Sequence, residues 1–426
     1  MTTTRPPATP AVEEEIDCPG VAHGGEAVGR LADGRAVFVP GAIPGERVRV
    51  RVTERRARFA RAELLEVIEP SPDRIQAPCP HFGPGRCGGC TWQHIQPAAQ
   101  AALKARLVRE QLAHVGGLDD IEVRDTLRPQ APGAPEGFGY RERATLTAGA
   151  DGRLGFLRSG SHEVYPVDRC PLLAAPLQDL PGRIGRQPAG SRVRLRAGAG
   201  GERLAVLEAA AMRSAQARPP AQPGLAWAAV QANGKVRDGE GNPYVTEAVA
   251  GIRLHVSAAS FYQVHRDGAD LLVRLVTRAL RPRSSDVLVD LYAGVGLFAA
   301  TVGAGVREVV AVESWKPAAQ DAERNLRRHR SAKVVRDDAL RGLGKLRGAD
   351  IVVLDPPRAG AGGKVVAAVA KLAPRGVALV SCDPAALARD VRAFVDAGYE
   401  AAWVQPVDLF PQTAHVEAVT ALRRRD

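Results

Sequence analysis

The sequence has no hydrophobic run long enough to cross a membrane. No stretch approaches the roughly 18 consecutive apolar residues that a spanning helix needs. Residues 1–10 are polar and rich in proline, without the apolar core of a signal peptide. These absences argue against a membrane protein and a secreted protein, and they predict a cytoplasmic location without membrane contact.

Cysteine is also scarce, with six residues in a chain of 426. So few thiols in a reducing compartment argue against a disulfide framework and favour metal binding or catalysis. Four of them form a group in which the first three lie within twelve residues: Cys79, Cys87, Cys90 and Cys170. Four thiolates complete the ligand set of a tetrahedral zinc ion or of a four-iron cluster, and they leave iron no open position for radical chemistry. Unpaired structural thiols are the alternative.

The length and the charge of the chain set its broad class. With 426 residues, of which 45% are hydrophobic, two or three domains are expected. The 58 Lys and Arg residues outnumber the 47 Asp and Glu residues, giving a formal net charge of +11. This excess favours a polyanionic partner such as nucleic acid, although an arginine-rich composition can also follow from genomic base bias.

The N-terminal part predicts a small closed β-barrel. After a disordered tail at 1–12, residues 13–70 carry short alternating segments separated by glycine. Arg47, Arg49 and Arg51 alternate with valines, so the three guanidinium groups share one face of a strand. Such a face suits contact with RNA phosphates, and a solvated barrel surface is the alternative.

The rest of the chain divides into a central and a C-terminal part. Residues 71–258 hold the cysteine group, a helical stretch at 97–115 and a β-rich run at 140–165. The Pro- and Ala-rich passage 213–227 is expected to be a loop or a degenerate element. In residues 259–426, strands and helices alternate. This alternation predicts an α/β domain with a mostly parallel sheet covered on both faces.

A glycine-rich turn with the sequence DLYAGVG begins at residue 290 and joins a strand to a helix. Gly294 and Gly296 allow the backbone to approach a ligand, and Glu313 at the end of the next strand can accept hydrogen bonds from a ribose. The aspartate ahead of the glycines is typical of the S-adenosylmethionine turn of class I methyltransferases. Asp338, after the third strand, is placed to meet an adenine amino group, with a helix N-cap or a role for Asp337 as alternatives.

Three polar residues follow or open predicted strands near the C-terminus: Asp355, Cys382 and Glu417. In an open α/β sheet such positions converge on one crevice. A lone thiol is more often a small buried apolar group, but Cys382 also precedes a helix, whose amides are expected to lower its pKa. A thiolate there can add to C6 of a pyrimidine, which makes C5 nucleophilic toward a sulfonium methyl, and Glu417 can then remove the C5 proton.

These motifs resemble the RNA uracil-C5 methyltransferases that carry an N-terminal TRAM domain. The resemblance spans nearly the whole chain. It is carried by RAVFVP from residue 35, PGE from 44, CGGC from 87, SFYQV from 260, DLYAGVGLF from 290, DPPRAG from 355, VSCDPAALARD from 380 and DLFPQTAHVE from 408.

The resemblance implies a fold, a reaction and a site. The fold is a Rossmann-like class I methyltransferase domain with an OB-like TRAM barrel and a β-rich central domain. Cys382 is the implied nucleophile and Glu417 the implied base, while S-adenosylmethionine or the base is bound by the positions Gln263, Tyr292, Glu313, Asp338 and Asp355. The four cysteines are implied to hold a [4Fe-4S] cluster of structural or RNA-orienting function, with zinc as the less favoured alternative. The implied substrate is structured RNA, 23S ribosomal RNA ahead of transfer RNA, and the expected enzyme is a monomer.

Three positions depart from the family pattern: His265 stands in place of Asn, Ala293 in place of Cys, and Asp383 in place of the Asn that follows the nucleophile. The segment 181–242 also matches poorly. The substitutions at 265 and 383 motivate a rival hypothesis, a non-catalytic RNA-binding factor on the same scaffold. Cytosine-C5 methylation is a weaker rival, because that chemistry generally uses a second cysteine in the proline motif, and DPP from residue 355 has none.

Overall fold

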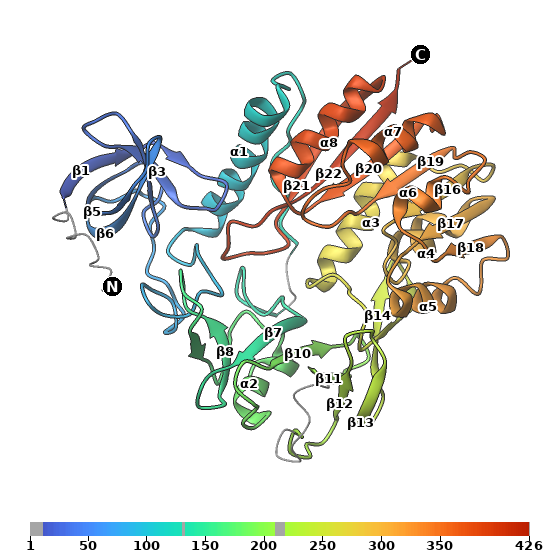
Figure 1. The fold of residues 1–426 in the computed structure, drawn as a ribbon, viewed down its shortest axis with the longest axis horizontal. Coiled ribbons are helices and arrows are strands. Elements are labelled where there is room, and N and C mark those ends of the chain that lie inside the picture. The colour runs from blue at the N-terminus through green and yellow to red at the C-terminus, as the bar shows by residue number, and fades with distance from the viewer. Residues whose placement is uncertain (1–11, 130–132, 209–217, 426) are drawn as a thin grey trace, which may run out of the picture.

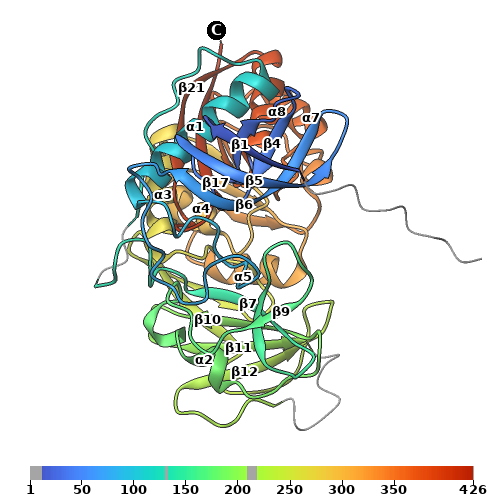
Figure 2. The ribbon, with the colours of Figure 1, turned by 90° about the vertical axis from the view of Figure 1, so that its left-hand side faces the viewer.

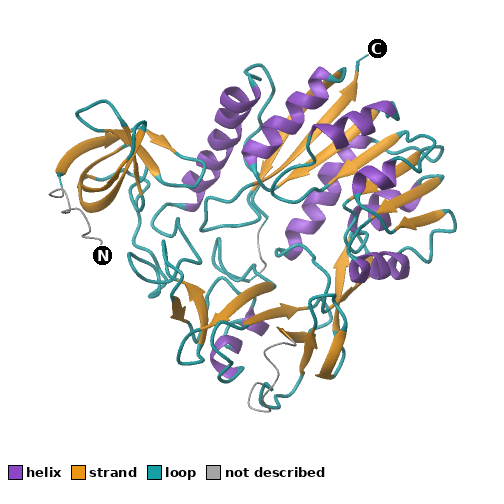
Figure 3. Ribbon diagram, in the orientation of Figure 1, coloured by secondary structure: helices purple, strands orange, loops and turns teal. Residues whose placement is uncertain are grey.

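The computed structural model describes residues 12–129, 133–208 and 218–425. Three sheet-based parts follow one another along the chain (Figure 1). The N-terminal barrel lies on one side, the central sheet lies at the bottom, and the C-terminal domain holds most of the helices (Figure 3). In the view turned by 90° the central sheet again lies below the other two parts (Figure 2).

The N-terminal part is a six-stranded sheet in the order β1-β5-β6-β4-β3-β2. Alternate residues of its strands point inward, and Val37, Val48 and Val50 are fully buried in its core. The alternation predicted from the sequence therefore produces the barrel. Its strands are β1 (Glu13–Cys18), β2 (Gly20–Val21), β3 (Ala27–Arg30), β4 (Ala36–Val39), β5 (Glu46–Arg55) and β6 (Phe59–Glu69).

The central part is a seven-stranded sheet in the order β13-β12-β11-β10-β7-β8-β9. The expectation of a loop or a degenerate element over 213–227 is wrong at its end, because β12 begins at Leu225; residues 213–217 lie outside the described residues. Two short helices, η1 (Ala175–Leu177) and α2 (Leu180–Arg183), pack against the sheet. The strands are β7 (Arg143–Ala148), β8 (Leu154–Leu157), β9 (Val164–Pro166), β10 (Arg192–Ala197), β11 (Arg203–Glu208), β12 (Leu225–Val230) and β13 (Val236–Glu240). A hairpin of β14 (Tyr244–Val249) and β15 (Ile252–Ser257) follows.

The C-terminal domain is a seven-stranded sheet in the order β18-β17-β16-β19-β20-β22-β21. Strands β16 to β20 are parallel, and β22 runs antiparallel between β20 and β21. The strands are β16 (Val287–Leu291), β17 (Glu308–Val312), β18 (Ala332–Val335), β19 (Ile351–Leu354), β20 (Gly376–Ser381), β21 (Tyr399–Val407) and β22 (Glu417–Arg424).

Helices cover both faces of this sheet, as its apolar strands require. Helices α3 and α4 pack on one face, and α6, α7 and α8 pack on the other. The helices are α3 (Arg266–Leu280), α4 (Leu297–Thr301), η4 (Val302–Gly305), α5 (Lys316–Asn325), α6 (Ala339–Leu343), α7 (Gly363–Lys371) and α8 (Pro384–Asp396). None of the described helices is both long and apolar enough to span a membrane.

The long helix α1 (Pro97–Gly116) joins the C-terminal domain, although the sequence division assigns it to the central part. Val108 and Leu112 are buried in one core with strands β16 and β19 and helix α8. Further along, Val123 and Leu127 form parallel bridges with β21. Residues 97–128 therefore belong structurally to the C-terminal domain, and α1 lies beside α8 in Figure 1.

Candidate active site

Three predicted site residues meet at one cavity. Asp355 follows β19, Cys382 follows β20, and Glu417 opens the antiparallel strand β22. All three line a cavity of about 490 Å³, together with Gln263 and Tyr292. The cavity lies where the strand order reverses between β16 and β19, the usual ligand position in an open α/β sheet.

Two carboxyl groups in this cavity have raised pKa values. Glu417 is 4% exposed, and its Oε1 atom has no hydrogen-bond partner among the described residues. Burial raises the pKa of Glu417 well above its ordinary value, and the charge of Asp355 raises it further, against the opposing effect of Arg358. Burial also raises the pKa of Asp355 to about 7, while Gln263 Nε2 donates to Asp355 Oδ2 at 3.4 Å. Once ionised, Glu417 is therefore a stronger base than a solvated carboxylate.

The prediction of a lowered pKa for the Cys382 thiol is wrong in its net result, although a hydrogen bond from the backbone N–H of Cys382 does lower this pKa. Burial raises this pKa to about 11, and the negative charges of Glu417 and Asp355 add to the increase, against a lowering by Arg358. The N-cap of α8 is Asp383, whose Oδ1 accepts from Ala386 N at 2.8 Å. The cap thus engages a carboxylate instead of the thiol, and desolvation dominates the ionisation of Cys382.

The glycine turn after β16 has an unusual backbone. Tyr292 and Gly294 both adopt left-handed conformations, with φ of 59° and 57°. A tyrosine in this region is strained, which is a feature of functional turns. Gly294 N donates to Glu313 Oε2 at 2.9 Å, so Glu313, which follows β17, is hydrogen-bonded to the turn. Within the described chain, the cavity lining includes Tyr292 and Gly294 but not Gly296 or Glu313.

Asp338 acts as a helix N-cap, the alternative that the sequence left open. Its Oδ1 accepts from Arg341 N at 3.0 Å at the start of α6, and Arg341 Nε lies 2.5 Å from Oδ2. Asp337 pairs with Arg341 and with Lys345, at 2.7 and 2.8 Å. Among the described residues that line the cavity, neither aspartate appears. Contact of Asp338 with an adenine therefore stays a prediction.

A second cavity, of about 440 Å³, shares the lining residues Cys382, Arg358 and His415 with the first. It adds His23 from the barrel and Arg141 from the central part. Sequence reasoning missed these two residues, because no local motif marks them and only the tertiary fold brings them to Cys382. Arg358 lies only three residues after Asp355 in the DPPR motif, so the sequence did indicate that this arginine lies near the site.

The loop that leads to Glu417 is fastened by helix α1. Lys104 is fully buried, pairs with Asp408 Oδ1 and donates to Phe410 O at 3.1 Å. Gln100 Nε2 donates to Gln412 Oε1 at 3.0 Å, and Gln412 N donates to Gln100 Oε1 at 2.9 Å. A buried ion pair and a reciprocal amide pair thus set the position from which β22 begins.

The arginine face of the barrel is neutralised, which corrects the expectation of a face free for phosphates. Each arginine is bracketed by glutamates of the neighbouring strands β1 and β6. Arg47, Arg49 and Arg51 lie 2.6 to 3.8 Å from these carboxylates, which belong to Glu13, Glu15, Glu63, Glu66 and Glu69. Cross-strand pairs of this kind stabilise a sheet, and a phosphate has to compete with them.

The four cysteines of the predicted metal group come together. Cys79, Cys87, Cys90 and Cys170 line one pocket, although the last is far along the chain from the others. Burial raises the pKa of Cys87 to about 11 and that of Cys90 to about 12. Over the described residues, no group of three or more His, Cys, Asp or Glu side chains has an arrangement that could hold a metal ion.

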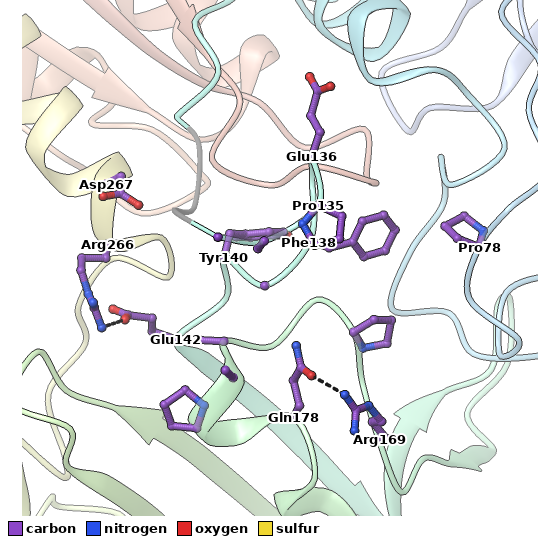
Figure 4. Close-up of a pocket in the computed structure, with 17 residues that line it drawn as sticks. Pro78, Pro135, Glu136, Phe138, Tyr140, Glu142, Arg169, Gln178, Arg266 and Asp267 are labelled. Atoms are coloured by element: carbon purple, nitrogen blue, oxygen red, sulfur yellow. Dashed lines mark hydrogen bonds and ion pairs between the residues drawn. The ribbon is translucent and has the colours of Figure 1, made fainter.

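A larger cavity, of about 750 Å³, is lined by segments 133–142 and 169–178 and by the start of α3 (Figure 4). Both of its arginines are engaged: Arg266 pairs with Glu142, and Arg169 donates to Gln178 Oε1 at 2.9 Å. The predicted catalytic pair and four of the predicted cofactor positions line other cavities: Cys382, Glu417, Gln263, Tyr292, Gly294 and Asp355. Size alone therefore does not make this cavity the candidate site.

The sheet order, the glycine turn and the cavity at the strand ends define a class I methyltransferase domain behind a small β-barrel. The TRAM domain family matches residues 13–65. An uncharacterized RNA methyltransferase from Streptomyces coelicolor is 39% identical, over 96% of this chain and 92% of the relative. The 23S rRNA (uracil(1939)-C(5))-methyltransferase RlmD from Pseudomonas entomophila is 33% identical, over 91% and 88%. The chain belongs to this family of TRAM-domain RNA methyltransferases.

A solved structure agrees with this fold. The tRNA (uracil-54, C5)-methyltransferase of Pyrococcus abyssi, in complex with S-adenosyl-L-homocysteine, superposes with a TM-score of 0.72 at 23% sequence identity. The superposition covers 96% of this chain and all of that chain. The α/β fold with an N-terminal TRAM barrel is thereby confirmed. The family inferred from the sequence motifs is confirmed by the relatives.

Proposed function

We propose that this protein methylates C5 of a uridine in RNA, with S-adenosylmethionine as methyl donor, through a transient bond between Cys382 Sγ and C6 of the uracil. The observation that carries this proposal is the meeting of Cys382 and Glu417 on the wall of one cavity at the carboxyl ends of β19 and β20. A thiol and a strong carboxylate base facing one space are the two groups that this substitution requires.

Each residue has one task in the proposed reaction. The Cys382 thiolate forms the Sγ–C6 bond, and the electron pair of the C5–C6 double bond moves toward C5 and O4. S-adenosylmethionine supplies an electrophilic sulfonium methyl group. C5 accepts this methyl as its bond to sulfur breaks, and S-adenosylhomocysteine is the leaving group. Glu417 then takes the proton from C5, the C5–C6 double bond re-forms, and the Sγ–C6 bond breaks to release the thiolate. The raised pKa of Glu417 makes it an effective acceptor for this proton.

The donor fits the glycine-rich side of the cavity. Tyr292, Gly294 and Phe298 line that side, and the positive φ of Gly294 leaves its backbone open to a close approach. Glu313, held against Gly294 N, supplies carboxylate oxygens for a ribose. We assign Gln263 and Asp355, which face the same cavity, to the uracil or to the methyl donor.

The proposed substrate is 23S ribosomal RNA, and the proposed enzyme is a cytoplasmic monomer. The choice of 23S ribosomal RNA is supported by the 33% identity to the relative from Pseudomonas entomophila, whose name gives 23S rRNA as its substrate. The structural neighbour that acts on transfer RNA shares 23% identity, and its likeness concerns the fold. A uridine in a folded RNA has to leave its stack to reach Cys382, which costs a few kcal/mol.

The four-cysteine pocket is proposed to hold a [4Fe-4S] cluster of structural or RNA-orienting function. Support comes from the donor set, since four thiols converge on one pocket from two distant segments. The test is anaerobic purification followed by metal analysis and absorbance near about 400 nm. Four iron atoms per chain with this absorbance support the cluster, and a colourless protein with one zinc overturns it.

Replacement of the nucleophile tests the proposed function. Cys382→Ala is expected to abolish transfer of a labelled methyl group to 23S rRNA, while Cys18→Ala, which removes a thiol buried in the barrel core, is expected to keep it. Persistence of methyl transfer in Cys382→Ala contradicts covalent catalysis. Mapping of 5-methyluridine in the ribosomal and transfer RNA of a strain without this gene identifies the substrate.

A further inference from the structure

A turn of the TRAM barrel reaches into the active site. The turn at residues 22–26 joins β2 and β3, and Gly25 O accepts from Trp92 Nε1 at 2.9 Å. Gly25 has a φ of 88°, and a Cβ added to it would lie 2.4 Å from Ala414 Cβ. The turn is therefore packed tightly against the loop that leads to Glu417, and it is part of the same structure as the catalytic wall.

His23 in this turn contacts the residue next to the proposed nucleophile. Its Nε2 lies 3.0 Å from Asp383 Oδ2, and both residues line the second cavity together with Cys382. The side chains are 42% and 26% exposed, so each is accessible from this cavity. The contact joins the N-terminal barrel to the first turn of α8 across 360 residues of sequence.

The N-cap of α8 does not by itself require a charged side chain at position 383. Its Oδ1 caps α8 by accepting from Ala386 N, and asparagine caps helices as well as aspartate does. The carboxylate charge is therefore unnecessary for the helix. It is unfavourable for an RNA strand near Cys382, because it repels phosphates, whereas Arg141 and Arg358 in the same cavity attract them. His23 is the side chain that engages this carboxylate, through Nε2 at 3.0 Å from Oδ2.

We propose that His23 is a positioning residue of the active site, which holds the Asp383 carboxylate in place at the entrance by which RNA reaches Cys382. The barrel thus completes the catalytic wall in addition to any RNA contacts on its outer surface. This inference rests on the proposed function, since it assigns RNA to the second cavity. It concerns a residue that lies outside the motifs of the C-terminal domain.

A double-mutant cycle on the full chain tests the proposal, with His23→Ala, Asp383→Asn and their combination. An exposed pair contributes less than about 1 kcal/mol, so His23→Ala is expected to lower kcat/KM for RNA by about fivefold, mostly through KM. Asp383→Asn keeps the cap and removes the carboxylate, so it provides the reference background of the cycle. In the Asp383→Asn background, loss of His23 is expected to cost less than about twofold, which is a rescue.

The exposed His114 at the end of α1 provides the control, and His114→Ala is expected to leave kcat/KM unchanged. An equal loss from His23→Ala in both backgrounds, or no loss in either, overturns the proposal. The same cycle is measured as Kd for RNA at low and high salt, where the His23→Ala defect should shrink as salt rises. Binding does not need turnover, so the Kd measurement separates the two proposals. If the wild type transfers no methyl group but the cycle still shows the coupling in Kd, the proposed function is contradicted and the role of His23 is not.

Discussion

The charges around Cys382 predict how fast its thiol reacts. The pKa is raised from 9.0 to about 11, first by burial and then by the charge of Glu417. At a pH above the raised pKa of Glu417, where this carboxylate is ionised, Glu417→Gln removes its charge, so the thiolate is less disfavoured and the pKa of Cys382 falls. If the fall is about one unit, the thiolate fraction at such a pH, still below the pKa of the thiol, rises about tenfold, and the lower nucleophilicity of a more acidic thiol reduces the net gain to about threefold.

The assay is the rate of iodoacetamide modification of Cys382, followed by mass spectrometry of its peptide at several pH values. Glu417→Gln is expected to be modified about threefold faster than wild type at the same pH. Arg358→Gln is the matched control of opposite sign, because Arg358 lowers the pKa of the thiol and its loss should slow modification. A slower reaction in Glu417→Gln, or shifts of the same sign in both variants, would refute the electrostatic reasoning.

Two further predictions concern stability and RNA binding. Lys104→Ala leaves the carboxylate of Asp408 buried without its partner. The free energy of unfolding, measured by denaturant titration, should therefore fall by about 3–5 kcal/mol. A loss below about 1 kcal/mol would contradict the role of this pair. Arg49 is held by Glu66, so Arg49→Ala should change the Kd for RNA by less than about twofold. Arg358→Ala, in the cavity that holds Cys382, should weaken RNA binding more. Equal effects of the two variants in a filter-binding assay at fixed salt would contradict this order.

The sequence pattern was sufficient to predict features that depend on one strand or one helix. Strand β20 ends at Ser381, so Cys382 follows a strand as predicted. Helix α3 begins at Arg266, where His265 Nδ1 accepts from Gly268 N and caps it. The alternation of strands and helices was enough to predict the parallel sheet and the convergence of its strand ends.

Properties that depend on distant partners could not be read from the sequence. The arginine face of β5 looks basic in one strand, and its neutrality comes from glutamates on the strands at either side. The raised pKa of Cys382 depends on burial and on Glu417, which no local pattern reports. The contact of His23 with Asp383 also needs the tertiary structure, since it joins opposite ends of the chain.

The covalent intermediate is the central claim, and one measurement tests it most directly. Glu417→Gln protein is incubated with its RNA and S-adenosylmethionine, and the mixture is run on a denaturing gel. Without the base that removes the C5 proton, the Sγ–C6 bond cannot be released, so a protein–RNA adduct should accumulate and should disappear when Cys382→Ala is added to the same chain. If no adduct forms although the variant binds the RNA, the protein does not use Cys382 as a nucleophile, and the account is contradicted.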